Sequence, residues 1–334
     1  MSGASRDLKV LSVLIVGCGN IAGGFDQGRS TNDFPYTHAG AYTRDGRFNI
    51  AVCVEPDDAR RAEFMQRWSV PEGYADIAEL ASHAGRYDVI SVCSPTSEHY
   101  RDVLAAIDLK PELIFCEKPV TPSALQTAEL VERCKIAGIV LVVNYTRRWD
   151  ADVMRLRDEL RAGVWGAIRS VTGVYTKGIL NNGSHMIDLL HLFFGKLELR
   201  SVGIPVWDML SDDPAIPALL ECTNNINVQL ACGHAQDFSL FELQIVTGKG
   251  VICMEDGGLK WRIRRAIESP HFRGYRSLDA GERKSGTLPA ATLAAVTEIH
   301  AALTQGGSVS CTGENALATQ QVCETIRNRA GEYS

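Results

Sequence analysis

The chain has 334 residues, which is enough for about two domains. Hydrophobic residues make up 45% and charged residues 22%, so the chain can bury a core without disulfides or a metal. The net charge of −6 argues against nucleic acid or an anionic membrane surface as the main partner. No run approaches about 18 apolar residues, and this excludes a predicted membrane span.

Cellular location is indicated by the N-terminus and the cysteines. The apolar stretch near the N-terminus runs directly into Gly17-Cys18-Gly19, as a strand would, and it lacks the pattern of a secretory signal. The ten cysteines include no C-x-x-C pair and no spacing typical of a zinc site, and most lie in apolar runs. We therefore expect free thiols, a cytoplasmic protein and no bound metal.

Short apolar runs alternate with helical patterns over the first 145 residues. Almost continuously apolar runs are typical of parallel strands that are covered on both faces. The predicted strands are Val13–Val16, Ile50–Val54, Val89–Cys93, Leu113–Cys116 and Ile139–Val143. This alternation predicts a doubly wound parallel sheet of the Rossmann type over residues 1–146.

Three helices are predicted between these strands. Two of them span Asp57–Trp68 and Ser97–Ile107. The third has Thr121 as N-cap, Pro122 at the first helical position and Gly138 as its end, with Leu125, Ala128 and Val131 on one face. Asp26–His38 is polar and rich in turn residues, and we expect it to be a loop insertion.

The pattern changes from about residue 147. A helix near Asp152–Arg161 is followed by alternating segments such as Ile226–Leu230, which are typical of strands with one buried face. Phe238–Val246 and Val251–Glu255 flank a glycine turn and predict a hairpin. We expect residues 147–334 to form an α+β domain with an open, mostly antiparallel sheet, to bind substrate and to mediate oligomerisation. The final helices, from about Ala290, are predicted either to belong to this domain or to pack on the first one. Arg273–Gly286 is predicted to be a mobile loop.

A phosphate-binding loop is predicted directly after the first strand. Gly17, Gly19 and Ala22 fit the pattern G-x-G-x-x-G/A, in which the first glycine permits a tight turn and the second allows a pyrophosphate to approach the backbone. Asn20 and Ile21 complete the loop, and helix N-terminal amides would meet the phosphate charge. Taken alone, the motif also fits a glycine turn that binds nothing.

Glu55 ends the second predicted strand, where an acidic side chain can accept a hydrogen bond from an adenosine ribose. The same carboxylate would repel a 2′-phosphate, so the sequence favours NAD over NADP. Glu55 lies farther from the glycines than the usual ~20 residues, and the insertion after Phe25 accounts for the difference. An ordinary solvated carboxylate at a strand end is the alternative.

Two further turns and one helix identify a family. Ser94–His99 follows the predicted strand Val89–Cys93, and Glu117-Lys118-Pro119 follows the next one. Gly183–Leu190 has the pattern of a histidine-bearing helix, and Asn144–Asp150 joins the two halves. Together with the glycine loop, this order resembles the Gfo/Idh/MocA oxidoreductase family over nearly the whole chain. The resemblance implies an NAD(P)-dependent enzyme that acts on a hydroxyl or ketone of a sugar, cyclitol or nucleotide-sugar.

The resemblance assigns roles by position. Lys118 matches the active-site lysine and His185 the catalytic histidine, whereas a surface lysine and a polar helix face are the alternatives. The residues expected to contact the cofactor are Gly17, Gly19, Asn20, Ile21, Ala22, Glu55, Ser94, Pro95, Thr96, His99, Glu117, Lys118 and Pro119, with His99 in a capping or supporting position after a predicted N-cap at Ser97. Histidine titrates near neutral pH and suits proton transfer, and a lysine charge would stabilise a developing alkoxide.

The substrate side departs from the family at one position. Asn181 stands where many members have aspartate, and an amide cannot accept a proton as a carboxylate can. Arg147 and Lys177 are candidate substrate contacts, with solvated basic side chains as the alternative, and Lys177 would suit a phosphate or carboxylate. Asp188 is expected to orient the helix end or a substrate hydroxyl.

Two other functions stay open. The same fold can bind a dinucleotide without turnover, as a sensor does, or it can oxidise and re-reduce a substrate so that hydrolysis or epimerisation results. We also expect a homodimer or homotetramer assembled through the C-terminal sheet, because an open sheet face needs to be covered.

Overall fold

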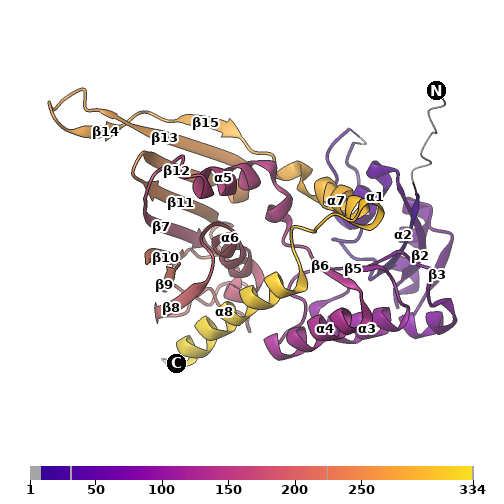
Figure 1. Cartoon of the computed structure of the whole chain (residues 1–334). Helices are drawn as coiled ribbons and strands as arrows, with labels where there is room; N and C mark the ends of the chain where they lie inside the picture. Colours follow the sequence, from indigo (N-terminus) through magenta and orange to yellow (C-terminus); the bar gives the residue numbers. More distant parts are fainter. Residues whose placement is uncertain (1–8, 31, 224, 333–334) are drawn as a thin grey trace, which may run out of the picture. The chain divides into compact units, whose positions relative to one another are not determined.

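The fold is taken from a computed structural model, which describes residues 9–30, 32–223 and 225–332. Its contacts divide the chain into two compact units (Figure 1). The first unit takes the described residues up to Thr146 together with Pro289–Ala316, and the second takes Arg147–Leu288 and the described residues from Leu317 onward. No helix in the described ranges is long and apolar enough to cross a membrane.

The first unit contains the predicted doubly wound sheet. Its strands are all parallel and have the order β3-β2-β1-β4-β5-β6. Almost every side chain in β1, β4 and β5 is buried, since helices cover both faces. The strands are β1 (Leu11–Val16), β2 (Phe48–Val54), β3 (Glu72–Tyr74), β4 (Val89–Val92), β5 (Leu113–Cys116) and β6 (Val140–Val143).

The helices of this region are α1 (His38–Asp45), α2 (Asp58–Trp68), α3 (Thr96–Asp108), α4 (Ala124–Ala137) and, nearer the C-terminus, α7 (Ala291–Gln305). Helix α2 begins one residue later than predicted, and Asp57 is its N-cap, with a side chain that accepts from the amide of Arg60. The predicted N-cap at Ser97 was wrong, because α3 already begins after Pro95. The last helix of the chain is α8 (Gly313–Gly331).

Two predictions for α4 were wrong. The helix begins at Ala124 with Ser123 as N-cap, and the Thr121 hydroxyl instead donates to the Ser123 carbonyl in the preceding turn. Leu125 is 81% exposed, and the buried positions are Ala124, Thr127, Leu130 and Cys134. Thr127 is buried on this side of the helix, where its hydroxyl lies 2.9 Å from that of Thr121. The predicted end at Gly138 is confirmed.

The predicted insertion separates α1 from a helical turn that follows the glycine loop. A helical turn starts at the glycine loop, where the amide of Gly23 donates to the carbonyl of Gly19. The amides of His38 and Ala39 then donate to the carbonyls of Ile21 and Ala22, which lie 17 positions earlier in the chain. In a continuous α-helix an amide donates to the carbonyl four positions earlier. The chain therefore leaves the helix, forms a short turn over Gly24–Asp26 and rejoins the same helix at His38.

The second unit contains a nine-stranded, mostly antiparallel sheet, as predicted (Figure 1). Its path is β14-β13-β12-β11-β7-β10-β9-β8, with β15 also pairing with β13, and only β7 and β10 run parallel. The strands are β7 (Ile168–Tyr175), β8 (Leu197–Val202), β9 (Ala218–Cys222), β10 (Ile226–Cys232), β11 (Phe241–Thr247), β12 (Gly250–Glu255), β13 (Lys260–Glu268), β14 (Arg276–Leu278) and β15 (Glu282–Ser285).

The hairpin prediction is confirmed, with β11 starting three residues later than expected. Arg273–Gly286 is not a loop, because β14 and β15 within it both pair with β13. The helices of this unit are α5 (Ala151–Arg161) and α6 (Ser184–Phe194), and Met186, Leu189 and Leu190 of α6 pack into the core formed with the sheet.

A buried ion pair links α6 to the start of the second unit. The Arg148 guanidinium donates to both carboxylate oxygens of Asp188 at 2.9 Å, and the Thr319 hydroxyl lies 3.4 Å from the same carboxylate. Burial raises the pKa of Asp188 to about 6, although the charge of Arg148 lowers it in part. Since both charges are removed from water, each depends on the other for its stability.

We expect Asp188→Asn to lower the free energy of unfolding by about 3–5 kcal/mol, because it leaves the Arg148 guanidinium buried without its counter-charge. Urea denaturation followed by circular dichroism measures the change. The matched control is Asp158→Asn on α5, whose side chain is 63% exposed and whose pair with Arg157 is worth less than about 1 kcal/mol. Equal stability of the two variants would contradict this account of the pair.

Candidate functional site

The glycine loop lies at the carboxyl end of β1. Gly17 has φ +85°, and a Cβ placed on it would lie 2.5 Å from the amide nitrogen of Ser94, so only glycine fits. Gly19 has no atom within 4 Å of an added Cβ, which leaves its backbone open to a ligand. The loop therefore presents an accessible backbone at the start of a helical turn.

Four amides of this loop have no acceptor among the described residues: those of Gly19, Asn20, Ile21 and Ala22. The neighbouring amides of Gly17 and Cys18 donate to the Val54 carbonyl and to Glu55. Unpaired amides at the start of a helical turn form an anion site, because their N–H dipoles point at the same place. This is the arrangement that a pyrophosphate requires.

Glu55 is buried at the end of β2 and ties the loop to α2. One carboxylate oxygen accepts from the Cys18 amide at 3.0 Å, and the other accepts from the Asp57 amide at 3.1 Å. Arg60, which the sequence analysis missed, lies 3.3 Å from the second oxygen. The carboxylate keeps further lone pairs and stands beside the loop, so it can accept a bond from a sugar hydroxyl.

The turn after β4 contains Ser94, Pro95 and Thr96. The Ser94 hydroxyl oxygen is buried and has no hydrogen-bond partner in the described part of the chain. His99 is itself buried, and its two ring nitrogens lie 2.9 Å from the Pro119 carbonyl oxygen and 2.8 Å from that of Ser94. His99 therefore connects this turn to the one after β5 and helps to hold both turns in place.

The turn after β5 contains Glu117, Lys118 and Pro119. The Glu117 side chain is only 13% exposed, and one of its oxygens accepts from His38 at 3.0 Å and from the Asn144 amide group at 2.6 Å. Burial raises the pKa of Glu117, but these two bonds and the charge of Lys118 outweigh it and lower the pKa. The other Glu117 oxygen accepts from the Lys118 amide at 3.3 Å, so Glu117 helps to fix the backbone of Lys118, a role that the spacing of the motif did not reveal.

His38 continues the network inward. Its second ring nitrogen lies 3.2 Å from the Ser91 hydroxyl, which also contacts the Tyr42 hydroxyl at 2.8 Å. The imidazole has no exposed surface and packs against Phe115. No motif pointed to His38, since the insertion separates it from the glycine loop to which its helix belongs.

These elements meet because of the strand order. β1, β4 and β5 are neighbours in a parallel sheet, so their carboxyl ends lie at one edge. The order reverses between β1 and β4, and the crevice at such a switch point is where open α/β sheets bind ligands. The glycine loop, the Ser94 turn and the Lys118 turn thus lie along one edge of the first unit.

The second unit holds the segment that leads to His185. Lys177 and Gly178 both have positive φ, and a π-helical turn over Gly178–Gly183 follows. The Asp208 side chain accepts from the Lys177 amide at 3.0 Å, and the Asp213 side chain accepts from the Asn181 amide at 2.8 Å. Two aspartates that the sequence analysis missed therefore fix the backbone of this segment.

His185 is partly exposed at the start of α6. Its ring meets Phe241 edge-on at a centroid distance of 6.5 Å, and the Arg147 guanidinium lies 4.0 Å from the centroid of the same phenyl ring. Arg147 also donates to the Gly257 carbonyl, and burial lowers its pKa to about 10. Phe241 thus brings Arg147 and His185 together within the second unit.

Two predicted roles on α6 need comment. Asp188 is buried and bonded to Arg148 and Thr319, so the structure does not support the prediction that it binds a substrate hydroxyl. His191 lies 3.0 Å from the Gly195 carbonyl at the end of the helix. No group of three or more His, Cys, Asp or Glu side chains in the described ranges is arranged to hold a metal ion.

Comparison with known proteins agrees with this geometry. The family profile described as "Oxidoreductase family, NAD-binding Rossmann fold" (GFO_IDH_MocA) matches residues 11–145. The chain is 26% identical to the D-glucoside 3-dehydrogenase of Escherichia coli over 271 residues, which are 75% of this chain and 69% of that protein. It is 29% identical to the myo-inositol 2-dehydrogenase of Thermotoga maritima over 107 residues, or 32% of this chain and 31% of that one.

A solved structure shares the fold over almost the whole length. Levoglucosan dehydrogenase in complex with NADH superposes with a TM-score of 0.78 at 15% identity, and the match covers 97% of this chain and 98% of that one. At this identity the likeness concerns the fold. Residues 11–145 of this chain are therefore an NAD-binding Rossmann domain of the Gfo/Idh/MocA oxidoreductase family.

Proposed function

We propose that this protein is an NAD-dependent dehydrogenase or ketoreductase that acts on a hydroxyl or ketone of a sugar, a cyclitol or a nucleotide-sugar. The observation that carries the proposal is the set of amides from Gly19 to Ala22, which have no acceptor in the described part of the chain, beside the buried Glu55 carboxylate. When bound, NAD supplies hydride transfer at its nicotinamide. The relatives named above act on a glucoside and on myo-inositol, which supports a polyhydroxylated substrate.

Each part of the edge has a proposed task toward the dinucleotide. The loop amides of Gly19, Asn20, Ile21 and Ala22 bind the pyrophosphate, and the tight turn at Gly17 makes room for it. Glu55 accepts from the adenosine ribose. The Ser94, Pro95 and Thr96 turn and the backbone of Lys118 and Pro119 border the nicotinamide end, whereas His99 and Glu117 hold these turns in place.

The protein's own residues have to move a proton while the hydride is transferred. We assign that proton to His185, which takes it from the substrate hydroxyl during oxidation and returns it during reduction. The Lys118 ammonium stabilises the negative charge that develops on the same oxygen. Arg147, Lys177 and Asn181 are proposed to contact the substrate, and a Lys177 contact would favour an anionic substituent.

We further propose a cytoplasmic homodimer or homotetramer. All ten cysteines are free thiols, which suits a reducing compartment. In the second unit, Leu219 of β9 pairs with Gln229 of β10, and both side chains are exposed on the open face of the sheet. A second copy of the chain covering that face would bury the exposed leucine.

Lys118→Ala and His185→Ala should each lower kcat by about 10²–10⁴-fold, because each removes acid/base or charge stabilisation at the reacting oxygen. Affinity for NADH, measured by fluorescence titration, should change by less than threefold. Turnover is followed at 340 nm with sugars and cyclitols as substrates. Lys135→Ala, on the exposed side of α4, is the control, and normal turnover by both site variants would contradict the assigned roles.

The Glu55 carboxylate should make NADH bind at least about tenfold more tightly than NADPH, which corresponds to about 1.4 kcal/mol. Glu55→Gln removes the charge that repels a 2′-phosphate, so the ratio of the two dissociation constants should shift toward NADPH. Fluorescence titration of both cofactors measures the ratio. Tighter binding of NADPH by the unmodified protein would show that Arg60 and not Glu55 determines the preference.

His38 should be a positioning residue for Lys118. His38→Ala deprives the Glu117 carboxylate of a hydrogen bond and should lower kcat by about 10²-fold, as small displacements of a catalytic group do, while the KM for substrate changes little. His38→Gln, which can still donate to Glu117, should recover part of the loss. His83→Gln in the same unit is the control, and a purely structural role for His38 would instead lower thermal stability and leave kcat unchanged.

A further inference from the structure

The insertion that precedes α1 is tied to the start of that helix by hydrogen bonds of Asp26. The Asp26 carboxylate is buried and accepts from the Tyr36 amide at 2.9 Å and from the amide and the hydroxyl of Thr37. Thr37 in turn caps α1 by accepting from the Gly40 amide. Excursions longer than about 12–15 residues are uncommon in compact domains, and the ordered ones usually serve a function.

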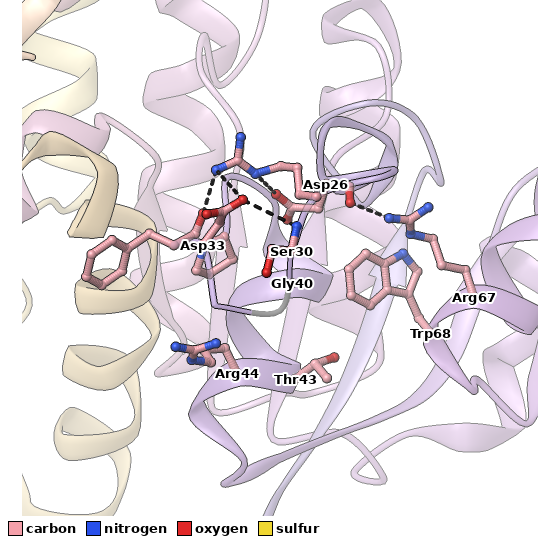
Figure 2. Close-up of a pocket in the computed structure, with 11 residues that line it drawn as sticks. Asp26, Ser30, Asp33, Gly40, Thr43, Arg44, Arg67 and Trp68 are labelled. Atoms are coloured by element: carbon pink, nitrogen blue, oxygen red, sulfur yellow. Dashed lines mark hydrogen bonds and ion pairs between the residues drawn. The ribbon is translucent and has the colours of Figure 1, made fainter.

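The insertion encloses a pocket together with α1 and α2. Its volume is about 430 Å³, within the range of about 300–1,000 Å³ that small-molecule sites occupy. Figure 2 shows Asp26 and Ser30 of the insertion on one side, Thr43 of α1 below them, and Arg67 and Trp68 of α2 on the other side. The pocket is separate from the proposed catalytic groups, since Lys118 and the Ser94 turn do not line it.

Two arginines that line the pocket, Arg29 and Arg67, differ in whether a carboxylate pairs with them. Arg29 is held inside the insertion by ion pairs with Asp26 and Asp33 and by stacking on Tyr36. Arg67 donates to the main-chain carbonyl of Asp26, but within the described ranges no carboxylate lies within ion-pair distance of its guanidinium. A guanidinium without a counter-ion at a pocket wall is a ready partner for a phosphate, whose oxygens match its planar donors.

The remaining wall favours a flat ring. Trp68 and Phe34 offer aromatic surfaces, and the Arg67 guanidinium lies 5.3 Å from the centroid of the Trp68 ring. The hydroxyls of Ser30 and Thr43 add polar contacts of the kind that a ribose uses.

We propose that this pocket binds a phosphate monoester that carries an aromatic ring, of the chemical class of a nucleoside monophosphate. Arg67 binds the phosphate, and Trp68 and Phe34 contact the ring. The site goes beyond the proposed dehydrogenase activity and does not depend on the identity of the substrate. Because Arg67 and Trp68 also line a smaller pocket of about 170 Å³ beside Gly19 and Asn20, binding has to be separated from occupation of the dinucleotide site.

The test is equilibrium dialysis of radiolabelled AMP against the full chain saturated with NADH. We expect AMP to bind at a dissociation constant below about 1 mM despite the bound dinucleotide, with adenosine and inorganic phosphate each at least tenfold weaker. Thr43→Phe fills the pocket from α1 without touching the glycine loop, so it should weaken AMP at least tenfold and leave NADH affinity unchanged. Arg67→Gln should weaken AMP to a similar extent.

Arg133→Gln, an exposed arginine on α4 of the same unit, should bind AMP as the unmodified protein does. The proposal is overturned if NADH abolishes AMP binding, if Thr43→Phe binds AMP normally, or if adenosine binds as tightly as AMP. A protein that fails to bind NADH would contradict the proposed function but not this site. In that case Thr43→Phe still decides the proposal when AMP is dialysed alone.

Discussion

A carboxylate inside a protein needs hydrogen-bond donors to remain charged. In the first unit the nearly buried carboxylate of Glu117 has this need, and the surrounding side chains meet it. His38 from the interrupted helix and Asn144 from the end of β6 both donate to it. The bonds therefore join α1, β5 and β6 at the carboxyl edge of the sheet, directly beside Lys118. The position of the proposed catalytic lysine depends on this network, because without it the charge of Glu117 would be too costly to keep inside.

The same constraint explains how the fold tolerates its insertion. The residues between Ala22 and His38 leave the helix and return to it, so that His38 occupies the place it would have in a continuous helix. The glycine loop and His38 therefore keep their positions at the sheet edge. The excursion adds a pocket that is also lined by α1 and α2, and the glycine loop keeps its place after β1.

Sequence patterns were sufficient to predict elements whose structure depends on a single factor, such as apolar burial or the backbone freedom of glycine. Continuous apolar runs located the parallel strands, and the glycine spacing located the loop whose amides are unpaired. Sequence patterns were insufficient where hydrogen bonds of single polar side chains decide the outcome. The Thr121 hydroxyl bonds to the Ser123 carbonyl, and Ser123 caps α4 in its place, while the buried pair of Arg148 with Asp188 has no signal in the sequence. His38, Asp208 and Asp213 carry no motif, since their partners lie more than 30 residues away along the chain.

The central claim is that this protein moves a hydride between a sugar carbon and a nicotinamide. Mass spectrometry of NADH formed from sugars deuterated at the carbinol carbon tests it most directly, with D-glucosides and myo-inositol as the first substrates. The account predicts one deuterium per NADH, bound at the nicotinamide C4. Oxidised sugar that forms while the NADH carries no deuterium, or deuterium that leaves the sugar without any accumulation of NADH, would contradict it.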